Sequence, residues 1–100
     1  MQLLYQRLRR CREVGGLTLA NIALWLDEPE STVKEWTVNR RYPRDYKLEH
    51  LYNKLDALEL AITEAGGSLI PPNIRQRDRN KYLRGLLDAR KSQVPVTDHP

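Results

Sequence analysis

Apolar residues recur along this chain at intervals of three and four, the spacing of one face of an α-helix. The pattern predicts five helices. Their expected inward residues are, in order, Leu3, Leu4, Leu8, Cys11 and Val14; Leu19, Ile22, Ala23 and Leu26; Thr32, Val33 and Trp36; Leu48, Leu51, Leu55, Leu58 and Ile62; and Tyr82, Leu83, Leu86 and Leu87. Only Leu69–Ile70 has any strand character. The sequence therefore predicts an all-α fold.

Glycine, threonine and proline residues set the helix boundaries. Paired glycines at 15–16 and 66–67 are expected to end the first and fourth helices. Thr18 is a suitable N-cap for the second helix. Pro29 is well placed to start the third, which must end before Pro43.

A chain of 100 residues is expected to form one domain with a single modest core. A fifth helix is expected over about 75–90, giving a helical domain over 1–92 and a flexible tail over 93–100. No apolar run reaches the roughly 18 residues of a membrane span. The single cysteine, Cys11, excludes an internal disulfide and any multi-cysteine zinc site, so we expect a reduced, cytoplasmic setting.

Charge is unevenly distributed along the chain. Residues 1–44 hold eight basic and five acidic side chains, residues 45–73 two and five, and residues 74–100 seven and three. Two basic ends therefore flank an acidic middle. This arrangement suits a protein that presents separate faces to a polyanion, and it also fits ordinary solvated helix faces.

Residues 18–40 have the pattern of two short helices that cross at a tight turn. Ala23 supplies a small residue where the two helices cross. Ten residues later Val33 anchors the latter helix of the pair, and Trp36 closes the core. We expect both tryptophans, Trp25 and Trp36, to be core residues rather than base-stacking platforms. The register leaves four residues of the latter helix, the third of the chain, facing outward: Glu30, Ser31, Lys34 and Glu35.

The stretch LTLANIALWLDEPESTVKEWTVNRRYP, residues 17–43, resembles the helix-turn-helix of Xre/Cro-type phage and bacterial repressors. The resemblance implies a lambda-repressor-like fold in which the second and third helices form the motif, followed by a long fourth helix. It implies that DNA bases are contacted by Glu30, Ser31 and Lys34. It also implies phosphate contacts from Thr18, Asn39, Arg40, Arg41 and Arg44.

The run RQRDRNK at 75–81 places several cations at the expected start of a helix: Arg75, Arg77, Arg79 and Lys81. Cations there oppose the helix dipole, at a cost of a few tenths of a kcal/mol each. Contact with phosphates or with an acidic partner would explain the run and is the favoured interpretation, so we expect these four residues to contact DNA phosphates. A solvated face, or pairing with the acidic fourth helix, would explain it as well.

Catalysis has no support in the sequence. No Ser/His/Asp set, glycine-rich phosphate loop or CxxC motif is present, and His50 and His99 lack partners at metal-ligand spacing. We therefore expect no enzymatic activity, no metal and no cofactor.

The function expected from the sequence is binding of double-stranded DNA by a small phage-type transcriptional repressor. Such a protein would act in a bacterial or phage-infected cell as a homodimer or higher homo-oligomer, because one short helix reads few base pairs. A phage small terminase subunit, or another DNA-packaging or recombination accessory protein, is an alternative. A second alternative is a protein-interaction module with a degenerate helix-turn-helix, motivated by the acidic turn at Asp27, Glu28 and Glu30. The leucines of the fourth helix could line the domain core or an intersubunit seam, and the core is favoured.

Overall fold

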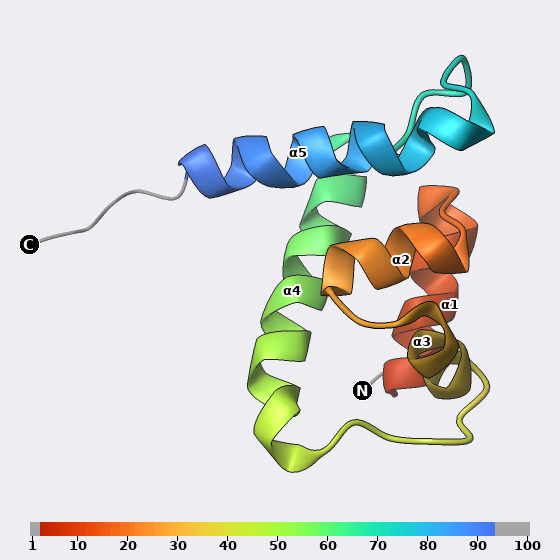
Figure 1. Ribbon diagram of the computed structural model, residues 1–100, viewed down its shortest axis with the longest axis vertical. Coiled ribbons are helices and arrows are strands. Elements are labelled where there is room, and N and C mark those ends of the chain that lie inside the picture. Colours follow the sequence, from red (N-terminus) through yellow and green to blue (C-terminus); the bar gives the residue numbers. More distant parts are fainter. Residues whose placement is uncertain (1–2, 94–100) are drawn as a thin grey trace, which may run out of the picture.

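The computed structural model describes residues 3–93, and within that range the chain is helical, without strands. The elements are α1 (Leu4–Gly15), α2 (Leu19–Leu26), α3 (Glu30–Thr37), α4 (Asp45–Glu64), the short 3-10 helix η1 (Gln76–Asp78) and α5 (Arg79–Gln93). Figure 1 shows α1, α2 and α3 gathered on one side of α4, with α5 crossing the C-terminal end of α4. The predicted all-α, five-helix fold is confirmed.

α1 buries one stripe of side chains, Leu4, Leu8 and Cys11. Two residues that the sequence assigned to this stripe, Leu3 and Val14, are instead 54% and 47% exposed. Leu3 precedes the first turn as the N-cap, and Gly15 rather than Val14 occupies the next buried position. A Cβ atom at Gly15 would lie 2.7 Å from Ile62 Cδ1, so glycine allows α4 to approach α1 closely.

α2 and α3 are two eight-residue helices joined by a tight turn. The predicted cap is confirmed, since the Thr18 hydroxyl accepts a hydrogen bond from the Asn21 backbone N–H at 3.1 Å. Asp27 ends α2 in the left-handed region at φ 57°, which Asp tolerates better than most residues. Pro29 immediately precedes α3. The residues expected in the core of this pair are buried: Ile22, Ala23, Leu26, Val33 and Trp36.

α4 supplies the longest buried stripe of the molecule, consisting of Leu51, Leu55, Leu58, Ala61 and Ile62. These side chains lie in the core of the single chain, as the favoured interpretation of the leucine pattern expects. Leu48, one turn closer to the start of α4, is half-buried. Trp25 and Trp36 are 4% and 3% exposed, so their predicted core role is confirmed.

The segment before α5 departs from expectation in where the helix begins. Leu69–Ile70 is not a strand, in keeping with the predicted all-α fold; both side chains are buried, and the Leu69 N–H donates to the Gly15 carbonyl at 3.0 Å. The fifth helix begins at Arg79 rather than Arg75, after the 3-10 turn of η1. The two prolines that follow Ile70 cannot join a helix interior, and Arg75 remains extended at ψ 149°, which delays the start of α5.

α5 packs mainly against α2. Leu83 is fully buried, and Tyr82, Leu86 and Leu87 pack at the edge of the core. The expected tail falls outside the described residues from residue 94 onward. None of the described helices is both long enough and apolar enough to span a membrane.

Candidate nucleic-acid interface

The outer side of α3 carries the three residues predicted to contact bases, Glu30, Ser31 and Lys34. All three are exposed, because the opposite side of the helix is buried through Val33 and Trp36. We call these three residues the α3 ridge. The ridge presents a carboxylate, a hydroxyl and an ammonium group within one and a half helical turns.

Arg9 of α1 fixes the C-terminal end of α3. Its Nε donates to the Thr37 carbonyl at 3.0 Å, which satisfies one of the acceptors that a helix end leaves unpaired. The Arg9 guanidinium also lies 5.6 Å from the centroid of the Tyr5 ring. Beyond α3, Asn39 adopts φ 57° and turns the chain away from the helix. The ridge is therefore held on a helix whose end is anchored to α1.

A basic groove borders α3 on the side of the α3–α4 loop. Its volume is about 570 Å³, and it is lined by Thr32, Trp36, Arg41, Tyr42, Pro43, Arg44 and Lys47. We call it the loop groove. It brings together Arg41 and Arg44, both predicted phosphate contacts, with Lys47, to which the sequence analysis gave no role. Lys47 lies three residues after Arg44, the N-cap of α4, and this spacing could have revealed it.

Arg40 and Asn39, also predicted phosphate contacts, are exposed beside this groove. The Arg40 guanidinium lies 3.7 Å from the Glu35 carboxylate, and 74% of the Arg40 side chain is exposed. An ion pair this exposed contributes little to stability. Arg40 can therefore leave Glu35 for an external anion at small cost.

A second basic groove lies beside α1. Its volume is about 500 Å³, and it is lined by Arg9, Arg12, Glu13 and Leu17. We call it the α1 groove. Thr18, a predicted phosphate contact, follows Leu17 directly, but its hydroxyl already accepts the bond that caps α2. Arg9 and Arg12 were not among the predicted site residues. The sequence signal that could have found them is their position away from the apolar stripe of α1.

The two grooves contact α3 at different positions. Thr32 and Trp36 line the loop groove, whereas the carbonyl of Thr37, the last residue of α3, accepts a hydrogen bond from Arg9 of the α1 groove. Two basic depressions therefore lie beside the helix that carries the ridge.

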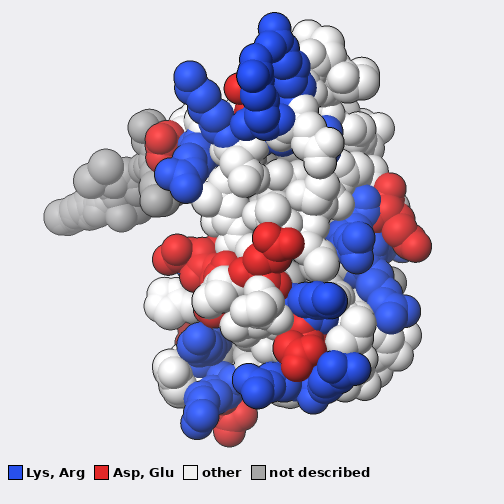
Figure 2. Space-filling view, turned by 45° about the vertical axis from the view of Figure 1, so that its right-hand side comes forward, with Lys and Arg blue, Asp and Glu red and all other residues white. Residues whose placement is uncertain are grey.

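Basic side chains gather at two ends of the face shown in Figure 2, with carboxylates between them. The α2–α3 turn contributes carboxylates at Asp27 and Glu28. Glu28 is 15% exposed, and its Oε1 lies 3.3 Å from Lys47 Nζ. The salt bridge neutralises part of the acidic turn at the edge of the loop groove.

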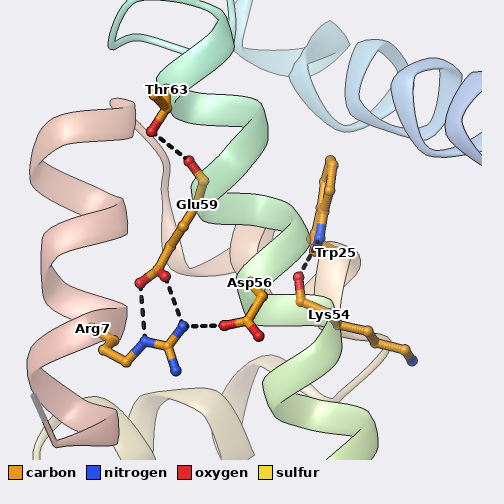
Figure 3. Close-up of polar contacts among 6 residues, drawn as sticks. All are labelled: Arg7, Trp25, Lys54, Asp56, Glu59 and Thr63. Carbon is orange, nitrogen blue, oxygen red and sulfur yellow. Dashed lines mark hydrogen bonds and ion pairs between the residues drawn. The ribbon is translucent and has the colours of Figure 1, made fainter. Parts of the chain in front are cut away.

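An arginine on α1 fixes α4, which forms one wall of the loop groove (Figure 3). Arg7 Nη2 donates to Asp56 at 2.6 Å and to Glu59 at 2.7 Å, while Arg7 Nε donates to Glu59 at 3.0 Å. The hydrogen bond to Glu59 outweighs desolvation and raises the pKa of Arg7 above its ordinary value. The position of α4 relative to α1 is therefore set by a charged, partly buried network.

Two further contacts hold α4 against its neighbours. The Trp25 indole N–H donates to the Lys54 carbonyl at 3.0 Å, which joins α2 to the middle of α4 (Figure 3). Tyr42, a wall of the loop groove, has its hydroxyl 2.8 Å from that of Tyr52. This hydrogen bond, together with burial, raises the pKa of Tyr52. The loop groove is thus built on a braced helix.

The four cations at 75–81, which we call the η1 cluster, are not equivalent. Arg75, Arg77 and Lys81 are exposed. Arg79 is half-buried, and its Nη2 donates to the Gly16 carbonyl just before α2. Arg79 therefore connects the start of α5 to the start of α2, while the other three present their charges to solvent.

The described His, Cys, Asp and Glu side chains form no metal-binding group, and the cysteine is buried. Within 3–93, no group of three or more His, Cys, Asp or Glu side chains could hold a metal ion. Cys11 is 2% exposed, and burial raises the pKa of its thiol to about 12, which keeps it protonated and a poor nucleophile. His50 is exposed on α4, and His99 lies outside the described residues.

A separate groove of about 740 Å³ lies between α2, α4 and α5, away from the α3 ridge. Its apolar lining is Leu24, Trp25, Ala57 and Leu87, and charged side chains rim it. This groove has the mixed character of a protein or small-molecule site rather than a phosphate track.

Comparison of this chain with protein-family models, with curated proteins and with solved structures finds no match. The candidate interface therefore rests on the geometry of this chain alone.

Proposed function

We propose that this domain binds double-stranded DNA as a helix-turn-helix protein, with α3 entering the major groove. The observation that carries the proposal is the exposed α3 ridge with two basic grooves near it, one lined by α3 and the α3–α4 loop and one beside α1. The major groove of B-DNA is about 12 Å wide and admits an α-helix. Phosphates border that groove on both sides, so cations are needed on both flanks of the inserted helix.

The α3 ridge supplies the base contacts of the proposed complex. Lys34 suits the O6 and N7 acceptors of guanine, and Glu30 suits the N4 donor of cytosine. The Ser31 hydroxyl can donate or accept. Because α3 is anchored at its end by Arg9, these side chains enter the groove from a helix of fixed orientation.

The grooves supply the phosphate contacts. Arg41, Arg44 and Lys47 hold one strand from the loop groove, and Asn39 and Arg40 lie next to them. On the other flank, the backbone is held from the α1 groove and the start of α2 by Arg9, Arg12 and Thr18. These contacts position the domain, and the ridge specifies the sequence.

The cellular role that fits such a domain is a small phage-type transcriptional repressor in a bacterial or phage-infected cell. It would act by occupying DNA, with no catalytic step and no cofactor. A single eight-residue helix reads few base pairs, so we propose a homodimer on two half-sites about 10 base pairs apart or a multiple of that spacing.

A DNA-packaging or recombination accessory, such as a small terminase subunit, is a second candidate, favoured by the 20-residue α4. Sedimentation of the protein separates the two roles, because a ring of many subunits favours packaging and a dimer favours the repressor.

A protein-interaction module is the candidate from another class. It is favoured by the carboxylates at Asp27 and Glu28 and by the apolar groove between α2, α4 and α5. For such a module, neutralising the basic grooves would leave partner binding unchanged.

Fluorescence anisotropy with a labelled random duplex tests the proposal. Non-specific binding comes from phosphate contacts, so affinity should fall steeply with salt, with a logarithmic slope of about −0.9 for each contact. The double variant Arg41→Ala/Arg44→Ala should reduce that slope by about two units. A matched control, Arg90→Ala/Lys91→Ala, removes the same charge from the far end of α5.

Binding of the wild type that is undetectable even at low salt would exclude the DNA-binding role. Equal losses in the Arg41/Arg44 variant and the control would show attraction by net charge rather than a defined groove.

A further inference from the structure

The start of α5 carries an excess of positive charge that the rest of the described chain does not neutralise. Residues 65–87 hold one acidic side chain, Asp78, and five basic ones, Arg75, Arg77, Arg79, Lys81 and Arg84. Among residues 3–93, no salt bridge involves any of these five cations. Clustered cations at a helix start repel one another and oppose the helix dipole. An external anion would relieve both unfavourable interactions.

Specific contacts attach this charge to the motif. Arg79 Nη2 donates to the Gly16 carbonyl, and Asn21 Nδ2 donates to Asn80 Oδ1 at 2.7 Å. Asn21 is only 2% exposed, and its Oδ1 also accepts the Thr18 backbone N–H at 3.0 Å. One buried amide therefore closes the cap of α2 and holds the start of α5. The η1 cluster cannot move independently of the start of α2.

The attachment places the η1 cluster next to the α1 groove. Gly16 and Leu17 connect α1 to α2, and Leu17 lines that groove. Arg79 holds the η1 cluster to this same connection. In Figure 2, basic side chains gather over the start of α5 at the top and again at the bottom of one face, the end at which the α3–α4 loop lies in Figure 1.

We infer that the η1 cluster is a second phosphate-binding site, which extends the α1 groove along the DNA backbone. Arg75, Arg77 and Lys81 contact phosphates, and Arg79 anchors them to α2. The domain then holds one duplex on both sides of the groove that α3 enters. The inference rests on the proposed function. It adds that the η1 cluster binds the DNA strand opposite the one held by the loop groove.

The duplex backbone suits this surface better than an acidic protein does. Arg12, which lines the α1 groove beside this attachment, is exposed and continues the same basic surface, which makes an extended track rather than an isolated patch. A repeating phosphate chain can follow such a track at every step. An acidic partner protein is the other outcome that the test must separate.

The test measures the salt slope of random-duplex binding for the double variant Arg75→Ala/Arg77→Ala in the full chain. We expect the slope to fall by about two units, with Arg90→Ala/Lys91→Ala as the control for charge alone. Both arginines are exposed, so the melting temperature should stay at the wild-type value. Combining this variant with Arg41→Ala/Arg44→Ala should reduce the slope by the sum of the two deficits.

Each other outcome overturns a distinct part of the account. Wild-type binding with an unchanged slope in the Arg75/Arg77 variant would refute the second site and leave the proposed function standing. If the slope reductions of the two double variants do not add when combined, and two duplexes bind per domain, the cations form two separate sites rather than one track. No binding by the wild type would remove both the site and the proposed function.

Discussion

Lys34 and Trp36 are two residues apart on α3, yet they lie in opposite environments. Lys34 is exposed on the ridge, whereas Trp36 is 3% exposed and packs in the core between α3 and its neighbours. Sequence periodicity predicted this division, because it needs only the helical repeat. Substitutions at the two positions should therefore differ in kind, one affecting DNA binding and the other folding.

Trp36→Ala should destabilise the domain by about 3–5 kcal/mol, because it removes a fully buried ring and leaves a cavity. Small domains are typically stable by only about 5–15 kcal/mol, so a large shift in thermal unfolding is expected. Tyr46→Ala is a matched control, since that ring is 75% exposed. A wild-type melting temperature for Trp36→Ala would show that the assigned helix register is wrong.

Lys34→Ala should cost about 1–3 kcal/mol on the preferred DNA sequence and little on random duplex, because it removes the proposed base contact. Arg40→Ala/Arg41→Ala should weaken both duplexes by a similar factor and flatten the salt dependence by about one to two units. The preferred sequence comes from a binding-site selection experiment. Equal weakening of both duplexes by Lys34→Ala would mean that Lys34 contacts a phosphate.

At the scale of helices, local signals predicted which elements form, and the differences lie at the edges of those elements. The Thr18 cap and the glycine stops follow from short-range chemistry, and the structure confirms them. Val14 was misassigned because the helical repeat of Leu4, Leu8 and Cys11 continues to Gly15, which has no side chain to mark the position as apolar. The late start of α5 also has a local cause, since two prolines follow Ile70 and Arg75 remains extended at ψ 149°.

The leucine stripe of α4 gives a test at this scale. Leu55 is fully buried in the single chain, so Leu55→Lys should unfold the domain rather than release a folded monomer. Leu60→Lys is the matched control, because Leu60 lies on the same helix and is 53% exposed. Circular dichroism measures whether each variant is folded, and sedimentation measures its oligomeric state. A folded, monomeric Leu55→Lys variant would place these leucines in an intersubunit seam.

At the scale of the whole molecule, the sequence pointed to α3 and its exit but not to the complete interface. The Arg9–Thr37 contact spans 28 residues and the Asn21–Asn80 contact spans 59. Neither follows from any periodicity, because each depends on how helices dock. The α1 groove and the attachment of the η1 cluster could therefore be found only from the folded chain.

The central claim is that duplex DNA lies against the α3 ridge and its flanking grooves. Titration of the ¹⁵N-labelled protein with duplex DNA, followed by backbone amide chemical shifts, tests it most directly. We predict that the largest shifts occur in α3 and in residues 39–47, with Asn53, Ala57 and Leu87 in the groove between α2, α4 and α5 little changed. Shifts confined to that groove, or none at low salt, would contradict the claim.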